Sequence, residues 1–116
     1  MFDFMNITRA LSDENRVRVV AALRDRELCV CQLIDMLELS PSTVSKHLSV
    51  LRNARLLNGR KEGRWMHYSL ADDRRRPMVS EAIDWVLRSV GKDPRIEADR
   101  RYLEGVSNDP AVKRCG

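Results

Sequence analysis

Two cysteines lie one residue apart in the segment ELCVCQL, as Cys29 and Cys31. Thiolates are soft ligands and select soft metal or metalloid centres. Two of them can share one small centre where the backbone is extended or only beginning a helix, because inside a regular helix they would point about 200° apart. A helix N-terminus also lowers the pKa of a thiol. The spacing therefore predicts a site for a thiophilic ion at a helix start, with two ordinary buried cysteines as the alternative.

The third cysteine, Cys115, is the penultimate residue of the 116. An odd number of cysteines without a secretory signal favours a cytoplasmic chain with reduced thiols over a disulfide scaffold. The longest apolar run, VVAAL, is far too short to cross a membrane, so we expect no membrane segment.

The composition fits one compact domain. Hydrophobic residues make up 43% of the chain and charged residues 33%, which favours a folded chain over disorder. The 21 Lys and Arg residues exceed the 17 Asp and Glu residues, which gives a net charge of +4 and a pI near 9.3. This mild positive charge permits binding to a polyanion but does not establish it.

The elements that must position the cysteines are predicted from helix caps and apolar spacing. Two helices are expected in the first 24 residues, the second with Ser12 as its N-cap. A short helix is expected over residues 30–37. A longer helix follows, with Ser40 as its N-cap and Pro41 as its first residue. The residues of this helix that we expect in the core are Val44, Leu48 and Leu51.

In the second half of the chain, the sequence pattern changes from one typical of helices to one typical of strands. Two short strands with Gly63 in their connection are expected to form a hairpin. Pro77 opens a further helix, and the segment DPRIEADRRYLEGV favours one more helix before a loose tail. This order predicts a mainly α fold with a small β-hairpin, a winged helix-turn-helix. We expect residues 1–91 to form the DNA-binding and dimerisation domain, and residues 92–116 to form the C-terminal helix and tail.

The helix after Pro41 carries a polar face suited to reading DNA. Small hydroxyl side chains let a backbone approach base edges, and basic side chains neutralise phosphates. The segment GRKEGR adds basic residues at the hairpin tip, where a wing contacts DNA. An ordinary solvated helix face is the alternative. The residues predicted to contact double-stranded operator DNA are Ser42, Thr43, Ser45, Lys46, His47, Ser49, Arg52, Arg60, Lys61 and Arg64.

Helix-turn-helix proteins usually act as dimers that place two recognition helices about 34–36 Å apart on DNA. The first helix, with Phe2, Phe4, Met5 and Ile7, and the helix that carries Trp85 hold spare apolar surface. We therefore expect a twofold homodimer built from these helices. The alternative is that these residues complete the core of one chain.

The motifs ELCVCQL, LSPSTVSKHLSVLRNARLL and GRWMHYSL resemble those of the arsenic-repressor family of bacterial metalloregulators (ArsR/SmtB). The segment ALSDENRVRVVAAL is similar to the family's second helix, and the resemblance covers about residues 5–90. It implies a homodimeric winged-helix repressor that needs no cofactor to bind DNA and leaves its operator when an inducer binds. The cysteine motif resembles the arsenic- and antimony-responsive branch, which implies arsenite or antimonite as inducer and Cys29 and Cys31 as ligands.

The chain departs from that branch at one position. Members with this motif often carry a third cysteine three residues after the second, and Ile34 stands there. Two thiolates leave the pyramidal, three-bond geometry of trivalent arsenic incomplete. Cys115 is a candidate third ligand, from the same chain or from the partner subunit. A small thiol or a hydroxide is the alternative, and Cys115 is then a tail cysteine without a role.

Other functions compete with this interpretation. Cys29 and Cys31 could form a switch that responds to oxidation or persulfide, or could bind another thiophilic metal such as cadmium. An enzyme is not expected, because no glycine-rich anion loop adjoins a cysteine. A metal buffer or chaperone would need neither the polar helix face nor the basic hairpin.

Overall fold

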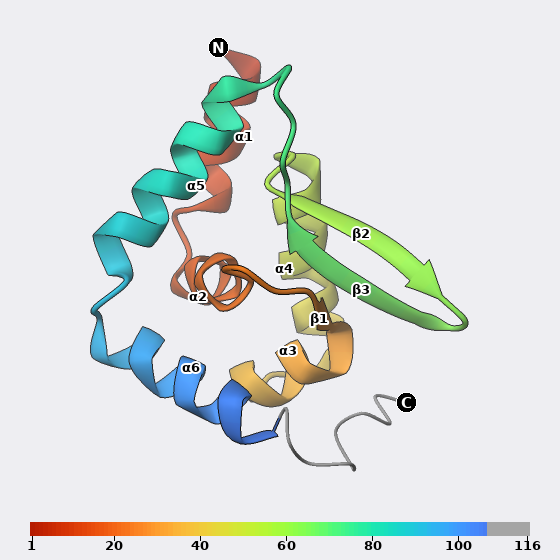
Figure 1. Cartoon of the computed structure of the whole chain (residues 1–116). Helices are drawn as coiled ribbons and strands as arrows, with labels where there is room; N and C mark the ends of the chain where they lie inside the picture. Colours follow the sequence, from red (N-terminus) through yellow and green to blue (C-terminus); the bar gives the residue numbers. More distant parts are fainter. Residues whose placement is uncertain (107–116) are drawn as a thin grey trace.

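Helices and a small antiparallel sheet make up the computed structural model, which describes residues 1–106 (Figure 1). The helices of this part are α1 (Phe2–Ala10), α2 (Glu14–Ala22), α3 (Val30–Leu37), α4 (Pro41–Asn53), α5 (Pro77–Val90) and α6 (Pro94–Val106). Its strands are β1 (Leu28–Cys29), β2 (Leu57–Glu62) and β3 (Trp65–Leu70). The order confirms the predicted winged helix-turn-helix, in which α3 and α4 form the helix-turn-helix and β2–β3 the wing. None of the helices in residues 1–106 is long and apolar enough to span a membrane.

The sheet joins the cysteine segment to the wing. Its strand order is β1-β3-β2, and both strand pairs are antiparallel. Cys29 lies opposite His67 of β3, and Arg60 of β2 lies opposite the same histidine from the other side. Figure 1 shows the wing projecting from one side of the molecule, while α1 and α5 run together on the other side. The segment that carries Cys29 is therefore paired directly with a strand of the wing.

The N-cap of α2 is Asp13, and the prediction that Ser12 fills this position is wrong. The Asp13 carboxylate accepts the backbone N–H groups of Asn15 at 2.8 Å and Arg16 at 3.2 Å. Asp13 has an extended backbone, so its carboxylate reaches the amides of the first turn. Ser12 instead donates its hydroxyl to the carbonyl of Arg9 and closes the end of α1.

The start of α4 agrees with the prediction. The Ser40 oxygen accepts the N–H of Thr43 at 3.3 Å, and Pro41 is the first helical residue. Proline fits this place because a first-turn N–H has no partner within the helix. The predicted core residues of the helix are at most 1% exposed, namely Val44, Leu48 and Leu51. Burial of this stripe turns the polar face of α4 to solvent.

The wing turn contains Gly63, as predicted. Glu62 pairs with Trp65, so Gly63 and Arg64 form a two-residue turn. Gly63 has a φ of 63°, a left-handed conformation that glycine adopts without strain. Lys61 belongs to β2 rather than to the turn. The tip of the wing therefore presents Arg64.

A buried ion pair holds α6 on the rest of the fold. Arg18 donates from Nε and Nη2 to the two oxygens of Asp99, at 2.9 Å each. It also donates to the carbonyl of Met36 in α3 and to the side chain of Asn15. The hydrogen bond to Asp99 raises the pKa of Arg18, against the opposing effect of burial. Consequently α6 packs on both α2 and α3.

Candidate functional site

The solvent side of α4 carries the polar residues predicted to contact DNA. His47 is partly buried, and the rest of this set is exposed. They lie opposite the buried apolar stripe and can approach base edges and phosphates together. The exposed members are Ser42, Thr43, Ser45, Lys46, Ser49 and Arg52.

His47 is oriented by a residue of α2. Arg16 Nη1 lies 3.2 Å from His47 Nδ1, and the same guanidinium donates from Nε to the carbonyl of Ala10 at 2.8 Å. Because an arginine side chain only donates hydrogen bonds, Nδ1 must accept. In the neutral ring the proton is then on Nε2, which leaves a fixed donor for a base edge or a phosphate.

The three basic residues predicted in the wing have different surroundings. Arg60 donates to both oxygens of Glu27, at 2.6 and 2.9 Å, and to Glu62 at 2.9 Å. The hydrogen bond from Arg60 lowers the pKa of Glu27. Lys61 is exposed on β2, and Arg64 is exposed at the tip. Arg60 thus braces the wing against the segment that precedes the cysteines.

Arg16 and Glu27 belong to the candidate site, although the sequence did not predict them. Arg16 is 31 residues from His47, and Glu27 is 33 residues from Arg60, so no local spacing rule connects either pair. For Glu27 one signal exists. It is two residues before Cys29, and in an extended segment such residues point to the same side.

Cys29 and Cys31 meet at the start of α3. Cys29 is the N-cap, with extended backbone angles (φ −73°, ψ 150°), and Cys31 lies in the first turn. Their Sγ atoms are 3.5 Å apart. The helix start was predicted for this pair, and the extended N-cap explains why the two side chains are not splayed apart as in a regular helix.

The N-terminus of α3 surrounds Cys29 with backbone amides. Gln32 Oε1 accepts the N–H of Cys29 at 2.9 Å, and the Cys29 sulfur faces the N–H of Gln32, which completes a capping box. Cys29 is 3% exposed, whereas Cys31 is partly exposed. An incoming ligand therefore reaches the pair from the side of Cys31.

The described residues contain two of the three predicted sulfur ligands, Cys29 and Cys31. Ile34 stands where a third cysteine was expected and packs, partly buried, against the core. Within residues 1–106, no group of three or more His, Cys, Asp or Glu side chains is arranged to hold a metal ion. Cys115, the predicted third ligand, and the predicted loose tail lie outside the described residues.

An apolar groove of about 460 Å³ runs between α1 and α5. On these helices Phe2, Phe4 and Trp85 are 76%, 52% and 62% exposed. They do not complete the core of one chain, so that alternative is wrong for these three residues. Ile7, which was expected on the spare surface, is 4% exposed and belongs to the core.

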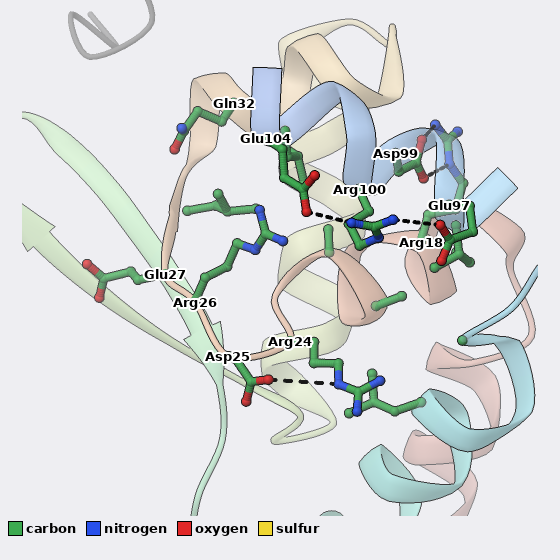
Figure 2. A pocket seen from close by; sticks show the side chains of 17 residues that line it. Arg18, Arg24, Asp25, Arg26, Glu27, Gln32, Glu97, Asp99, Arg100 and Glu104 are labelled. Carbon is green, nitrogen blue, oxygen red and sulfur yellow. Dashed lines mark hydrogen bonds and ion pairs between the residues drawn. The ribbon is translucent and has the colours of Figure 1, made fainter. Parts of the chain in front are cut away.

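A second hollow, of about 870 Å³, lies between α2, α6 and the connection that precedes β1 (Figure 2). Arg100 in its wall lies 2.7 Å from Glu97 and 2.6 Å from Glu104. The hydrogen bond from Arg100 lowers the pKa of Glu97. Gln32, which caps Cys29, enters the wall from α3. Because these charges are satisfied by one another, the hollow chiefly separates α6 from the cysteine segment.

Several known proteins resemble this chain in sequence and in structure. The family model described as "Bacterial regulatory protein, arsR family" matches residues 13–58. An arsenic resistance transcriptional regulator from Pseudomonas putida is 35% identical over 98 residues, which cover 84% of this chain and 69% of that protein. The structure of HlyU from Vibrio cholerae matches with a TM-score of 0.66 and 32% identity, over 78% of this chain and 94% of that chain. The structure of the AntR antimony-specific transcriptional repressor matches with a TM-score of 0.57 and 28% identity, over 74% of this chain and 75% of that chain.

The matched segment of the family model contains the helix-turn-helix and both clustered cysteines. The resemblance inferred from the sequence motifs is confirmed, and so is the expectation of a regulator rather than an enzyme. The chain belongs to the arsR family of bacterial regulatory proteins, which are DNA-binding transcriptional regulators.

Proposed function

We propose that this chain is a repressor that binds double-stranded operator DNA as a twofold homodimer and releases it when trivalent arsenic or antimony binds Cys29 and Cys31. The observation that carries the proposal is the 3.5 Å contact of the two sulfurs at the start of the helix-turn-helix. Similarity to proteins named for arsenic resistance and for antimony supports a metalloid ligand. No cofactor is needed for DNA binding.

The polar face of α4 reads the operator in the major groove. Lys46 and Arg52 neutralise phosphates, and His47 offers the Nε2 donor fixed by Arg16. Lys61 and Arg64 of the wing contact the backbone or the minor groove. Arg60 acts mainly by holding the wing at the correct angle, because Glu27 and Glu62 neutralise it.

The homodimer buries the apolar faces of α1 and α5. Large exposed side chains beside an apolar groove are typical of a protein interface. A twofold axis through these helices leaves both recognition helices outside the interface, which their spacing on successive major grooves requires. Residues 1–91 thus form the DNA-binding and dimerisation domain, and residues 92–116 add α6 and the tail.

The sulfur positions suit one small thiophilic centre. At a bond length of about 2.3 Å, as in zinc–thiolate sites, an angle of about 100° at the centre corresponds to sulfurs about 3.5 Å apart. The separation of the two Sγ atoms in the structure is also 3.5 Å. Little movement of the cysteines is then needed for the first two bonds, and the pyramidal geometry of trivalent arsenic leaves a third bond to be made.

The third bond provides the coupling to DNA. A third ligand, Cys115 or an external thiol or hydroxide, must approach from the exposed side of Cys31. Binding of this third ligand displaces the start of α3, which packs on α4. The displacement also shifts β1, which is paired with β3 of the wing. Inducer and operator then prefer different arrangements, and each weakens the binding of the other by the same factor.

The test measures operator release by fluorescence anisotropy, with a duplex selected from a random library as operator. Under full reduction, arsenite should release the wild-type chain, with a coupling of about 3 kcal/mol, or more than 100-fold in affinity. Cys29→Ser and Cys31→Ser should bind the duplex normally and not respond. Cys115→Ser is the matched control, and it responds fully if an external ligand completes the site. If both Cys29→Ser and Cys31→Ser still release the duplex with arsenite, the proposal is wrong.

Oxidation is a second candidate trigger, favoured by the same close contact of sulfurs. Two thiols that join as a disulfide give two protons and two electrons to an oxidant such as a peroxide, and persulfide chemistry acts on the same pair. Release by oxidant without any response to arsenite, antimonite or cadmium under full reduction would select this trigger. Release by cadmium alone would select another thiophilic metal.

A further inference from the structure

A basic hollow lies at the C-terminal end of α4, beneath the first residues of β2. Its volume is about 400 Å³. In Figure 1 it corresponds to the upper end of α4, where β2 begins and the connection from β3 to α5 passes. Three arginines and one aspartate line it, so its formal charge is +2. These residues are Arg52, Arg55, Arg76 and Asp73.

The Arg52 side chain lies against the backbone of Gly59 in β2. A Cβ atom added at Gly59 would lie 3.1 Å from Arg52 Cζ, so the guanidinium lies directly across the glycine. The close approach depends on the missing side chain. Arg52 is thereby directed from the polar face of α4 into the hollow.

Arg55 adopts a strained backbone conformation. Its φ is 66°, in the left-handed region that glycine enters freely and that costs free energy for a residue with a Cβ. This conformation ends α4 in a Schellman cap, in which the N–H of Leu56 donates to the carbonyl of Leu51 at 3.0 Å and the N–H of Arg55 donates to the carbonyl of Arg52 at 2.9 Å. The cap explains the backbone, and glycine would fit it without the cost of a Cβ. Arg55 is exposed at this end of the helix, so its side chain is accessible at the hollow that it lines.

Asp73 orients the third arginine. Its carboxylate lies 3.5 Å from Arg76 Nε and accepts the backbone N–H of Arg75 at 3.0 Å. A second acid, Asp3 of α1, lies 3.9 Å from Arg76 Nη1. These contacts hold Arg76 at the rim without cancelling the charge of Arg52 and Arg55.

We propose that this hollow binds a phosphate of the DNA backbone, at the point where α4 emerges from the major groove. The inference rests on the proposed binding of operator DNA. A helix of 13 residues is about 20 Å long, whereas the groove is about 12 Å wide, so one end of α4 must lie near the backbone. Carbonyl groups make a helix C-terminus negative, and a phosphate is tolerated there only beside several cations. Arginine suits this task because its planar fork donates two parallel hydrogen bonds to phosphate.

The test is the salt dependence of binding to a fluorescent, random-sequence 30-bp duplex, because non-specific affinity comes from phosphate contacts. Each lost contact lowers the slope of log K against log[salt] by about 0.9. Arg52→Gln and Arg55→Gln should each show this decrease. Their affinity deficit relative to the wild-type chain should shrink about 3.5-fold between 50 and 200 mM salt. Arg101→Gln, on α6 away from the hollow, is the matched control and should keep the wild-type slope.

Arg55→Gly separates a DNA contact from a structural role. It relieves the left-handed strain, so its melting temperature should rise while its affinity for the duplex falls. Affinity unchanged in both Arg55→Gly and Arg55→Gln overturns the inference. Binding of inorganic phosphate that depends on Arg52 and Arg55, together with unchanged duplex affinity in both glutamine variants, would instead assign the hollow to a free anion. If the wild-type chain binds no duplex, the proposed function itself is wrong. If the salt slope decreases in Lys46→Gln but in neither Arg52→Gln nor Arg55→Gln, only the proposed phosphate site in the hollow is wrong.

Discussion

The hydrogen bond between Arg16 and His47 links the core side of the helix-turn-helix to its DNA-reading side. Arg16 is also fixed by the carbonyl of Ala10, so the imidazole has one orientation and one neutral tautomer. A preset donor needs no reorganisation when a base edge arrives. We therefore expect recognition by His47 to depend on its contact with Arg16.

Arg16→Met tests this dependence, since it removes the donors but keeps the length of the side chain. We expect operator affinity to fall about tenfold, or about 1.4 kcal/mol, the scale of one charged hydrogen bond. Discrimination between base pairs at the contacted position should fall with it. Arg88→Met removes the same charge from α5 and should have little effect. Equal losses in both variants would show that only net charge matters.

The cap of α2 makes a second prediction at this scale. Asp13→Ala should lower the free energy of unfolding by about 1 kcal/mol, because two first-turn amides lose their acceptor. Ser12→Ala should cost less, since Ser12 bonds only one carbonyl at an exposed helix end. Urea denaturation measures both. A larger loss for Ser12→Ala would restore the serine as the important cap.

The residues that begin a helix could be predicted from the sequence where only one residue suited the position. Ser40 and Pro41 were predicted correctly because a hydroxyl followed by proline has few other uses. Ser12 and Asp13 were ambiguous, because both can accept first-turn amides. The Arg16–His47 bond was unpredictable, because it arises only when α2 and α4 pack together.

At the scale of elements, exposed ion pairs join the wing to the segment before the cysteines, in addition to the apolar packing of Leu57 and Tyr68 in the core. Arg60 connects β2 to Glu27, two residues before Cys29, and His67 Nδ1 lies 4.0 Å from the same carboxylate. The start of α3 was predicted because a regular helix would separate the sulfurs. The ion pair between Arg60 and Glu27 was not predicted, because it depends on the strand register that sets Arg60 opposite His67. We propose that the same contacts connect inducer binding at the cysteines to the angle of the wing.

Glu27→Gln should change how stability depends on pH. The pKa of Glu27 is lowered in the fold by the hydrogen bond from Arg60. Its contribution to stability is therefore complete above its ordinary pKa of 4.5 and is lost as the pH falls through the lower folded value. The difference in unfolding free energy between wild type and Glu27→Gln should be constant near neutral pH and vanish in acid. A difference that grows in acid would contradict the assignment.

At the scale of the whole molecule, α6 is joined to the helix-turn-helix by one buried pair of charges. Asp99→Ala should lower the free energy of unfolding by about 3–5 kcal/mol, because Arg18 is left buried without its counter-ion. The double variant Arg18→Met with Asp99→Leu should recover most of this loss, since apolar residues of similar size avoid the desolvation of both charges. Urea denaturation of the three proteins checks this. A double variant no more stable than Asp99→Ala would mean that the bonds of Arg18 to Met36 and Asn15 matter more.

The apolar faces of α1 and α5 determine whether two recognition helices act together. Trp85→Glu places a charge on the expected dimer interface at a side chain that is 62% exposed in one chain, so the fold itself should be preserved. We expect a monomer in sedimentation velocity at micromolar concentration. Operator affinity should fall by about 10²–10⁴-fold, because the second half-site no longer binds at high effective concentration.

Tyr102→Glu on α6 is the matched control for that experiment, because it adds the same charge at another exposed aromatic residue. It should remain dimeric and bind operator normally. Arsenite should still bind the Trp85→Glu monomer if the third ligand comes from the same chain or from solution. It should bind much more weakly if the partner subunit supplies that ligand. The same variant therefore tests the dimer and shows which chain completes the site at Cys29 and Cys31. A Trp85→Glu chain that stays dimeric would exclude the interface between α1 and α5.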